Sequence, residues 1–276
     1  MLRKILTLFN LLLLPRIIWA NRSLMWQLTK RNVLMRYKGS ALGLVWSFVQ
    51  PMMMLVVYTF VFSIVFKSRW GTDMSGGRGA FAVIMFCGLS IFNMFSEGVN
   101  SGCMSVIANT NYVKKVIFPL EILPVAQVLC TFILGTVWFV LLFIGSVFVL
   151  HHVDWMMLLL PVTLIPVLLF TMGVAMFVAS FSVFVRDTQY MVGVVLQVLF
   201  FMTPIFYPIE AVPERFRLAL QLNPLTVLID ETRKVFLYGT LPDWKYLGIA
   251  LLVSLVTLQL GFFWFTRTKR GFADVL

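Results

Sequence analysis

Few side chains in the apolar part of this chain could do acid–base or metal chemistry. The long hydrophobic stretches contain one clear acid, Glu97, and the only two histidines, His151 and His152, are neighbours in a short link. A lone His-His pair supplies half of the four ligands that a structural zinc site uses. A membrane enzyme or a proton relay instead gathers several ionisable groups at one depth. The sequence therefore predicts no catalytic residue, metal site or cofactor on this chain, and neither an enzyme nor a proton-coupled carrier.

The other reactive side chains of the apolar stretches fit structural roles. Cys87, Cys103 and Cys130 are odd in number and match no metal-binding spacing, so we expect small core side chains. Glu97 has two interpretations that the sequence leaves open. It is an interfacial residue with a local partner, or it is a contact or hinge with another helix.

No nucleotide site is encoded. The phosphate-cradling pattern G-x-x-x-x-G-K-[ST] does not occur, and the glycine-rich "SGGRGA" at 75–80 lacks its Lys and Ser/Thr. If ATP drives this protein, another chain hydrolyses it.

One basic cluster has the chemistry to meet a phosphate. Arg31, Arg36 and Lys38 fall within "KRNVLMRYK" at 30–38, next to the aromatic Tyr37. Arginine suits phosphate because its planar fork can donate two parallel hydrogen bonds. An equally good interpretation is general attraction to anionic lipids and to the cytosolic side of a membrane.

The composition indicates that much of the chain lies in lipid rather than in water. Of the 276 residues 61% are hydrophobic and 12% charged, whereas soluble domains carry about 25% charged residues, so we expect a membrane protein. The net charge of +11 lies beside long apolar runs, which favours basic flanks over nucleic-acid binding. Arg3 and Lys4 precede "ILTLFNLLLL", but this run is too short to span and lacks a good cleavage site, so it is predicted to be retained.

The fold class follows from six long apolar stretches. Backbone groups in lipid must bond within their own segment, which requires helices. We therefore predict one all-α polytopic membrane domain over 1–276. Its six transmembrane helices are predicted at 43–66, 80–100, 122–150, 155–185, 190–209 and 246–265. Lys and Arg are more numerous on the terminal side, which predicts that both termini are cytoplasmic.

Three segments outside the spans are predicted to be helical. Within the N-terminal region 1–42, residues 21–42 fit an interfacial helix, with Leu24, Leu28 and Met35 on one face and Trp26 as an anchor. Residues 104–118 can form a cytosolic helix that Pro119 ends. The outer segment 210–245 fits two short helices broken by "NP" at 223–224, although a surface loop with helical turns is the alternative.

Four stretches, in this order, resemble one family. "KRNVLMRYKGSALGLVWSFVQPMMML" at 30–55, "NYVKKVIFPLEILP" at 111–124, "VRDTQYMVGVVLQVLFFMTPIFYP" at 185–208 and "NPLTVLIDETRK" at 223–234 are similar to bacterial type-2 ABC exporter permeases for polysaccharides. The resemblance covers nearly the whole chain and is nearest to O-antigen exporters, with capsule and teichoic-acid permeases as relatives. Asn32 departs from the Asp that such proteins often have, which leaves a charged role there in doubt.

The resemblance implies an assembly and a cargo. Two copies of the chain would form a pore in the bacterial inner membrane, with two copies of a separate ABC ATPase that bind ATP and Mg. The cargo would be a polysaccharide on a polyprenyl diphosphate, moved from cytoplasm to periplasm, and the two outer short helices would act as a gate. The alternative is a type-2 permease for another cargo, such as a capsule or teichoic-acid polymer, a lipid or a drug.

The resemblance also implies site residues. Residues 104–118 and the start of the next span would couple to the ATPase, through Tyr112, Val113, Lys114, Lys115, Ile117, Phe118 and Glu121. The alternative is that Lys114 and Lys115 only fix the topology. From the chemistry of the basic cluster, rather than from the resemblance, Arg31, Arg36 and Lys38 are predicted to meet the lipid diphosphate at the cytosolic entrance. Aromatic rings of the first and fifth spans, on which sugars can stack, would line the polysaccharide path, namely Trp46, Phe48, Tyr58, Phe60, Phe62, Phe200, Phe201, Phe206 and Tyr207. Ordinary lipid-facing and belt aromatics are the alternative for these rings.

Overall fold

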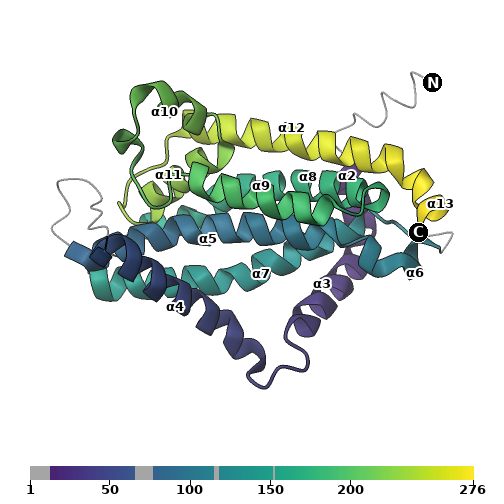
Figure 1. Ribbon diagram of the computed structural model, residues 1–276, viewed down its shortest axis with the longest axis horizontal. Helices are drawn as coiled ribbons and strands as arrows, with labels where there is room; N and C mark the ends of the chain where they lie inside the picture. Colours follow the sequence, from purple (N-terminus) through teal and green to yellow (C-terminus); the bar gives the residue numbers. More distant parts are fainter. Residues whose placement is uncertain (1–12, 66–76, 115–117, 152) are drawn as a thin grey trace.

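The described residues form a bundle of helices. The computed structural model describes residues 13–65, 77–114, 118–151 and 153–276, and this part of the chain contains helices and no strands. The long helices run roughly along one axis (Figure 1). One end of the bundle carries the short helix α6 (Thr110–Val113) and the C-terminus, and is called the α6 end below. The other carries α11 (Pro224–Phe236) and is called the α11 end. The predicted all-α membrane fold is confirmed at this level.

Five helical stretches of the described chain are long and apolar enough to cross a membrane. They are Gly43–Phe62, Gly79–Cys103, Ile122–Leu150, Trp155–Phe184 and Trp244–Val275. Their main helices are α4 (Trp46–Tyr58), α5 (Gly77–Cys103), α7 (Ile122–Gly145), α8 (Leu160–Phe184) and α12 (Trp244–Thr268). A π-helical turn extends both α4 and α7, and α13 (Phe272–Val275) follows α12 after one 3-10 turn. Five of the six predicted spans therefore correspond to helices of spanning length.

The remaining predicted span, 190–209, contains a shorter helix. This helix, α9 (Thr188–Met202), has 15 residues, which at 1.5 Å per residue is about 22 Å, less than the ~30 Å of a hydrocarbon core. It stops because Pro204 disfavours helical geometry at the residue before it, and Thr203 is extended. Residues 203–207 then continue as irregular chain.

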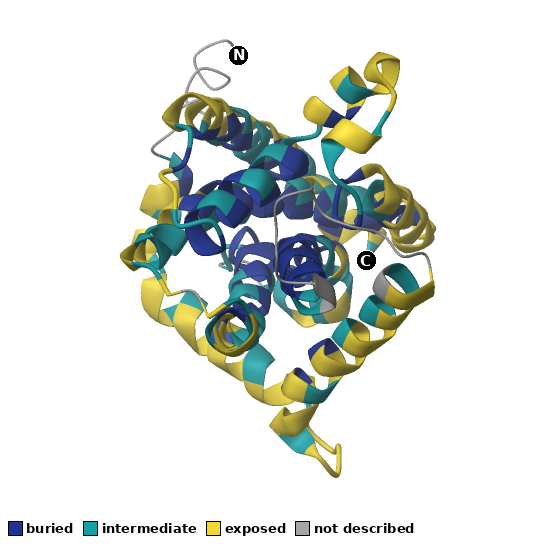
Figure 2. Ribbon diagram, turned by 90° about the vertical axis from the view of Figure 1, so that its left-hand side faces the viewer, coloured by how far each residue is buried: buried dark blue, intermediate teal, exposed yellow. Residues whose placement is uncertain are grey.

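Helix α5 is the centre of the bundle. It packs against α7, α8, α9 and α11, and most of its side chains are buried. Figure 2, which looks along the bundle, shows the buried residues gathered in the middle and the exposed ones around the rim. All three cysteines are buried and unbridged, which confirms their prediction as core side chains.

Helices α8 and α12 form the closest contact between two long helices. A Cβ atom added at Gly261 of α12 would lie 2.1 Å from the carbonyl oxygen of Gly173 on α8. Small residues allow such backbone approach in membranes, where packing rather than water exclusion drives helix association. The position therefore requires glycine.

Helix α4, by contrast, is covered by few residues of its own chain. Only Ser47 and Pro51 are buried in it. An open apolar groove follows its outer face, formed by Phe48, Val49, Met52, Met53, Val56 and Val57. Figure 1 shows α4 and α3 slanting away from the other helices toward the loop that joins them.

The N-terminal region contains two helices, α2 (Leu13–Ala20) and α3 (Arg22–Arg36). The predicted helix at 21–42 is thus present but ends at Arg36. Leu28 is buried and Leu24 half-buried, as expected for one apolar face, and α3 packs on α7. Met35 belongs to the same stripe but is exposed, as is Trp26.

The two other predicted helical segments differ in how closely they match. In place of one helix over 104–118, the described residues form a 3-10 turn at Ile107–Asn109 and the four-residue α6. Two helices do occupy the segment 210–245, namely α10 (Glu214–Gln221) and α11. Asn223 caps α11 by accepting a hydrogen bond from the Leu225 amide at 3.0 Å.

Candidate functional site

The side chains of the predicted basic cluster contact two different parts of the molecule, the link that contains α6 and the helix α5. The Arg31 guanidinium donates hydrogen bonds to the hydroxyl of Tyr112 at 3.0 Å and to Oδ1 of Asn109 at 3.3 Å. These bonds tie α3 to the link that contains α6. Arg36, five residues on, instead faces α5, and Lys38 lies exposed beyond the end of α3. The structure therefore does not join the three side chains into one site.

Arg36 forms an ion pair with Glu97 of α5, at 2.6 Å. This contact decides the structural question about Glu97, because its partner comes from another helix. Burial by itself lowers the pKa of Arg36, but the Glu97 carboxylate outweighs it, so the net pKa is raised and the guanidinium stays charged. The two side chains keep 31% and 41% of their surface exposed, so the pair can be reached from outside.

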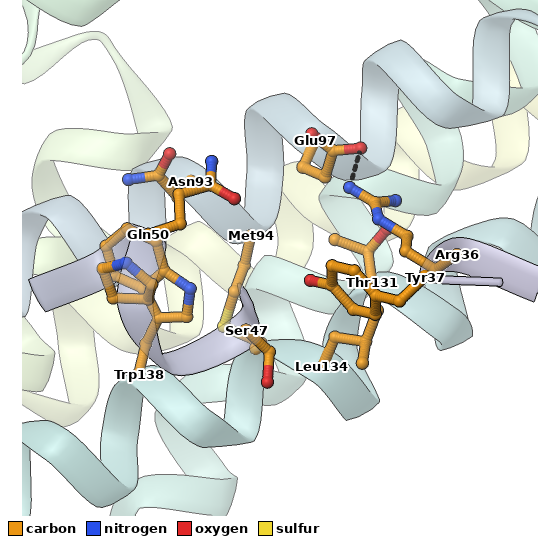
Figure 3. Close-up of a pocket in the computed structure, with 12 residues that line it drawn as sticks. Arg36, Tyr37, Ser47, Gln50, Asn93, Met94, Glu97, Thr131, Leu134 and Trp138 are labelled. Atoms are coloured by element: carbon orange, nitrogen blue, oxygen red, sulfur yellow. Dashed lines mark ion pairs between the residues drawn. The ribbon is translucent and has the colours of Figure 1, made fainter. Parts of the chain in front are cut away.

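A pocket surrounds this ion pair and is called the Arg36 pocket below. It lies where the end of α3 and the start of α4 meet α5 and α7. Figure 3 shows Arg36 and Glu97 pointing toward each other at one end, with Gln50 and Asn93 at the other. The lining is polar for a position beside a membrane core, and Glu97 is its only acid among the described residues. Its remaining polar members are Tyr37, Ser47, Gln50, Asn93, Thr131 and Trp138.

A second hollow, the α5–α9 groove, adjoins the Arg36 pocket along α5. It is lined by Tyr58 and by residues of α5 and α9. Besides the Tyr58 hydroxyl, four side chains of α5 and α9 carry amides or hydroxyls, namely Asn93, Ser96, Asn100 and Gln197. Amides both donate and accept hydrogen bonds, so this wall suits a ligand rich in hydroxyl groups. Asn93 and Glu97 line both the groove and the Arg36 pocket.

Apart from Glu97, these polar groups of α5, namely Asn93, Ser96 and Asn100, were missed in the sequence, although a signal was present. Residues 93, 96, 97 and 100 are polar and recur at helical spacing inside an apolar run. Such a stripe within a spanning helix marks a face that avoids lipid.

The predicted aromatic path separates into two groups. Tyr58, Phe62, Phe200 and Phe206 pack on one another, and the rings of Phe62 and Phe206 stack at a centroid distance of 4.3 Å. Much of their ring surface is therefore already in contact. The exposed group comprises Trp46, Phe48, Phe60 and Phe201. Tyr207, half-buried, donates its hydroxyl to the Phe201 carbonyl at 2.8 Å.

The predicted coupling residues also occupy different environments. Tyr112 stacks on Phe118 with ring centroids 4.5 Å apart, and Val113 is buried, whereas Lys114 is exposed. The side chain of Glu121 is buried at the start of α7 and forms an ion pair with Lys269, which follows α12. Lys115 and Ile117 lie outside the described residues.

Sequence reasoning did not assign a role to the buried arginine at the α11 end. Arg233 on α11 is 2% exposed and donates to the carbonyls of Pro204 and Ile205, both at 3.1 Å. It also pairs with Asp230 at 3.3 Å. Residues 203–207 are irregular and cannot bond their own carbonyls as a helix does, so Arg233 supplies the missing donors.

Comparison with known proteins places the whole chain in a family. Residues 23–237 match the family described as ABC-2 type transporter. An O-antigen export system permease protein RfbA of Myxococcus xanthus is 30% identical over 266 residues, which cover 95% of this chain and 98% of the relative. A protein of the same name from Klebsiella pneumoniae is 27% identical over 251 residues, or 90% and 93% of the two chains.

A relative named for polysialic acid transport is more distant. The polysialic acid transport protein KpsM of Escherichia coli is 24% identical over 238 residues, or 84% and 88% of the two chains. The resemblance to type-2 ABC polysaccharide permeases is thereby confirmed. The match spans the N-terminal helix α3, the polar wall of α5 and the α11 end alike. The chain therefore belongs to the ABC-2 type transporter family.

Proposed function

We propose that this chain is the membrane subunit of an ATP-driven exporter that moves a polysaccharide, linked to a polyprenyl diphosphate, from cytoplasm to periplasm. The observation that carries the proposal is the α5–α9 groove. It combines four amide and hydroxyl side chains with Tyr58, Phe200 and Phe201 inside an otherwise apolar bundle. Sugars offer hydroxyls to the former and flat carbon faces to the latter. Relatives named for O-antigen export and polysialic acid transport support this cargo class.

A pair of chains would enclose this groove. Helix α4 has few buried residues, and the outer face of α9 is apolar and exposed at Met191, Val194, Val195 and Val198. Two copies that met through α4 and α9 would bury these faces and turn both grooves toward a shared path. The exposed rings Trp46, Phe48, Phe60 and Phe201 would then line it or its rim, while the packed rings would shape its wall.

The sixth crossing is completed in this proposal by irregular chain. Helix α9 together with residues 203–207 reaches the α11 end, where Arg233 satisfies the carbonyls that no helix bonds. Non-helical backbone is tolerated at membrane depth only when protein satisfies it in this way. Helices α10 and α11 then form the gate on the periplasmic side.

The ATPase would bind at the α6 end, which is cytoplasmic in this proposal together with both termini. Its contacts are Lys114 and the undescribed residues Lys115 and Ile117, beside Tyr112, Val113, Phe118 and Glu121. ATP and Mg are bound by that separate chain. Arg36 and Lys38 meet the lipid diphosphate at the same end, and Arg31 links them to the coupling residues through Tyr112.

The test is export in cells. A bacterium that makes a lipid-linked polysaccharide but lacks its own exporter would receive this chain together with its cognate ATPase. We expect polysaccharide on the cell surface, and none with an ATPase unable to hydrolyse ATP. Asn100→Leu and Gln197→Leu, which remove polar groups from the groove, should reduce export several-fold at unchanged protein level. Val256→Leu on the exposed face of α12, outside the proposed contact between copies, is the matched apolar change.

Two results would overturn the proposal. One is a stable complex with active ATPase that exports no polysaccharide. The other is full export by the variant that carries both Asn100→Leu and Gln197→Leu, which would leave the groove without a role in the path. If the chain exports capsule-type polymers but no O-antigen, the proposed mechanism stands and only the proposed cargo is wrong.

A further inference from the structure

The side chains that line the Arg36 pocket could bind an anion, and a carboxylate of the protein itself, that of Glu97, lies against the arginine. Arg36 supplies the positive charge, and Tyr37, Gln50 and Trp138 each bring an O–H or N–H to the lining. Glu97 is the only acid there among the described residues, and its carboxylate lies 2.6 Å from the guanidinium. The carboxylate thus takes the position on Arg36 that a phosphate oxygen would take.

We propose that Glu97 is an internal competitor that occupies Arg36 until a phosphate-bearing headgroup displaces it. The inference rests on the proposed lipid-diphosphate cargo and assigns a role to a residue outside the basic cluster. Without a ligand the pair is neutral, which suits a site beside a membrane core because an unpaired charge there is costly. A phosphate group with more negative charge and several oxygens can engage the guanidinium in a bidentate way, which one carboxylate oxygen at this position does not.

The position of Glu97 gives its displacement a direction. The same side chain also lines the adjoining α5–α9 groove, together with Asn93. A carboxylate released from Arg36 therefore turns into a polar groove rather than into lipid. There it accepts hydrogen bonds from hydroxyl-rich ligand groups, so arrival of the headgroup in the Arg36 pocket prepares the adjoining groove for sugar.

Exposure makes the exchange possible without unfolding the pocket. Arg36 and Glu97 retain 31% and 41% of their side-chain surface. The main chain of Glu97 is held in α5 independently of its side chain, and its carbonyl accepts a hydrogen bond from the Ser101 hydroxyl at 2.7 Å. Only the carboxylate has to move.

The test is headgroup binding to the permease in complex with its ATPase, in nanodiscs of neutral lipid. The probe is a long-chain polyprenyl diphosphate, with the uncharged polyprenol as reference. We expect Glu97→Gln to bind the diphosphate about tenfold more tightly than the natural chain, as for removal of a close charge partner. Its affinity for the polyprenol should stay the same.

Three further variants separate the proposal from simpler effects. Asp274→Asn removes one negative charge from an exposed position at the same end and should leave both affinities unchanged. Arg36→Gln should abolish the preference for the diphosphate. The double variant Arg36→Gln/Glu97→Gln should bind it no better than Arg36→Gln alone, because the gain depends on the guanidinium.

Unchanged or weaker diphosphate binding by Glu97→Gln would overturn the proposal, and so would an equal gain in Asp274→Asn. The cell-export assay distinguishes this failure from that of the proposed function. If polysaccharide is exported but Glu97→Gln gains nothing, the internal-competitor role alone is wrong. If no polysaccharide is exported while Glu97→Gln gains affinity through Arg36, the anion site stands and the cargo is wrong.

Discussion

The Arg31 guanidinium and the Tyr112 hydroxyl are joined by a hydrogen bond of 3.0 Å, although 81 residues separate them in the chain. The guanidinium also lies 5.9 Å from the centre of the Tyr112 ring. Because Tyr112 stacks in turn on Phe118, the contact connects α3 to the link that is proposed to contact the ATPase.

Removing this contact should uncouple ATP hydrolysis from export. In Arg31→Gln and Tyr112→Phe we expect ATP turnover by the complex to persist while export per ATP falls several-fold. A thermal-unfolding cycle of the two variants should give a coupling of about 1 kcal/mol, as for one exposed hydrogen bond to a charged group. Arg22→Gln on the same helix, whose guanidinium bonds only locally to the Trp19 carbonyl, is the control. Additive effects of Arg31→Gln and Tyr112→Phe would show that the two side chains act separately.

The contact between α8 and α12 should not tolerate a methyl group. Gly261→Ala places its Cβ against backbone of Gly173, which cannot move aside as a side chain does, so the helices must separate. We expect a loss of about 1–3 kcal/mol in stability, as for overpacking, measured as a lower unfolding temperature in detergent. Gly248→Ala on the same helix has open space around its Cβ and should be neutral or slightly stabilising. Equal effects of the two changes would contradict this packing account.

Arg233 should be essential to the α11 end. Arg233→Met leaves the carbonyls of Pro204 and Ile205 without their donor and Asp230 without its partner. Each buried carbonyl left without a donor costs about 1–3 kcal/mol, and loss of the ion pair adds little because the Asp230 side chain keeps 41% of its surface exposed. Arg233→Lys should restore only part of this stability, because one ammonium group does not reproduce the planar fork. Arg215→Met, at an exposed position on α10, is the control, and thermal unfolding is the measurement. Wild-type stability in Arg233→Met would mean that the irregular stretch holds its shape by other means.

A charge cycle tests whether Glu121 acts on the ATPase or on its own fold. Its carboxylate is buried and pairs with Lys269. If the pair is structural, Glu121→Gln and Lys269→Met should each lower the unfolding temperature of the isolated permease, and the double variant should be no worse than the more severe single one. Should Glu121→Gln instead weaken ATPase binding at unchanged stability, a direct coupling role would follow. Lys114→Met, exposed, serves as the comparison in the binding measurement.

Apolar runs predicted the long helices well because a spanning helix is a local property of the sequence. The stretch 122–150 was placed to the residue, and five of six predicted spans have helices of spanning length. The remaining prediction, 190–209, failed in length, because the apolar run continues past Met202 while Pro204 ends the helix within it. The hydropathy of a stretch measures how well its side chains partition into lipid, and it does not detect a proline that ends the helix.

Site residues were harder to predict because their meaning depends on partners far away in the chain. Arg31 and Arg36 look equivalent in sequence, yet α6 engages one and α5 the other. The polar stripe on α5 was visible as spacing but could be assigned to a groove only once α9 lay beside it. For Arg233 the sequence showed only its i,i+3 spacing to Asp230, because its other partners are main-chain carbonyls, which every residue possesses.

The sparse cover on α4 has a consequence for synthesis. It is the first of the described spanning helices to leave the ribosome, and its own chain later covers little of it. Its residence in the bilayer therefore depends on its own hydrophobicity from the start, with lipid as its neighbour. Helices α8 and α12 are in the opposite situation, because Thr163, Ser180 and Ser254 are buried only after the bundle closes. The order in which the spanning helices are synthesised thus differs from the order in which they acquire packing partners. Helix α12, the last of the described spanning helices, completes the packing, while α4, the first of them, remains little covered by its own chain.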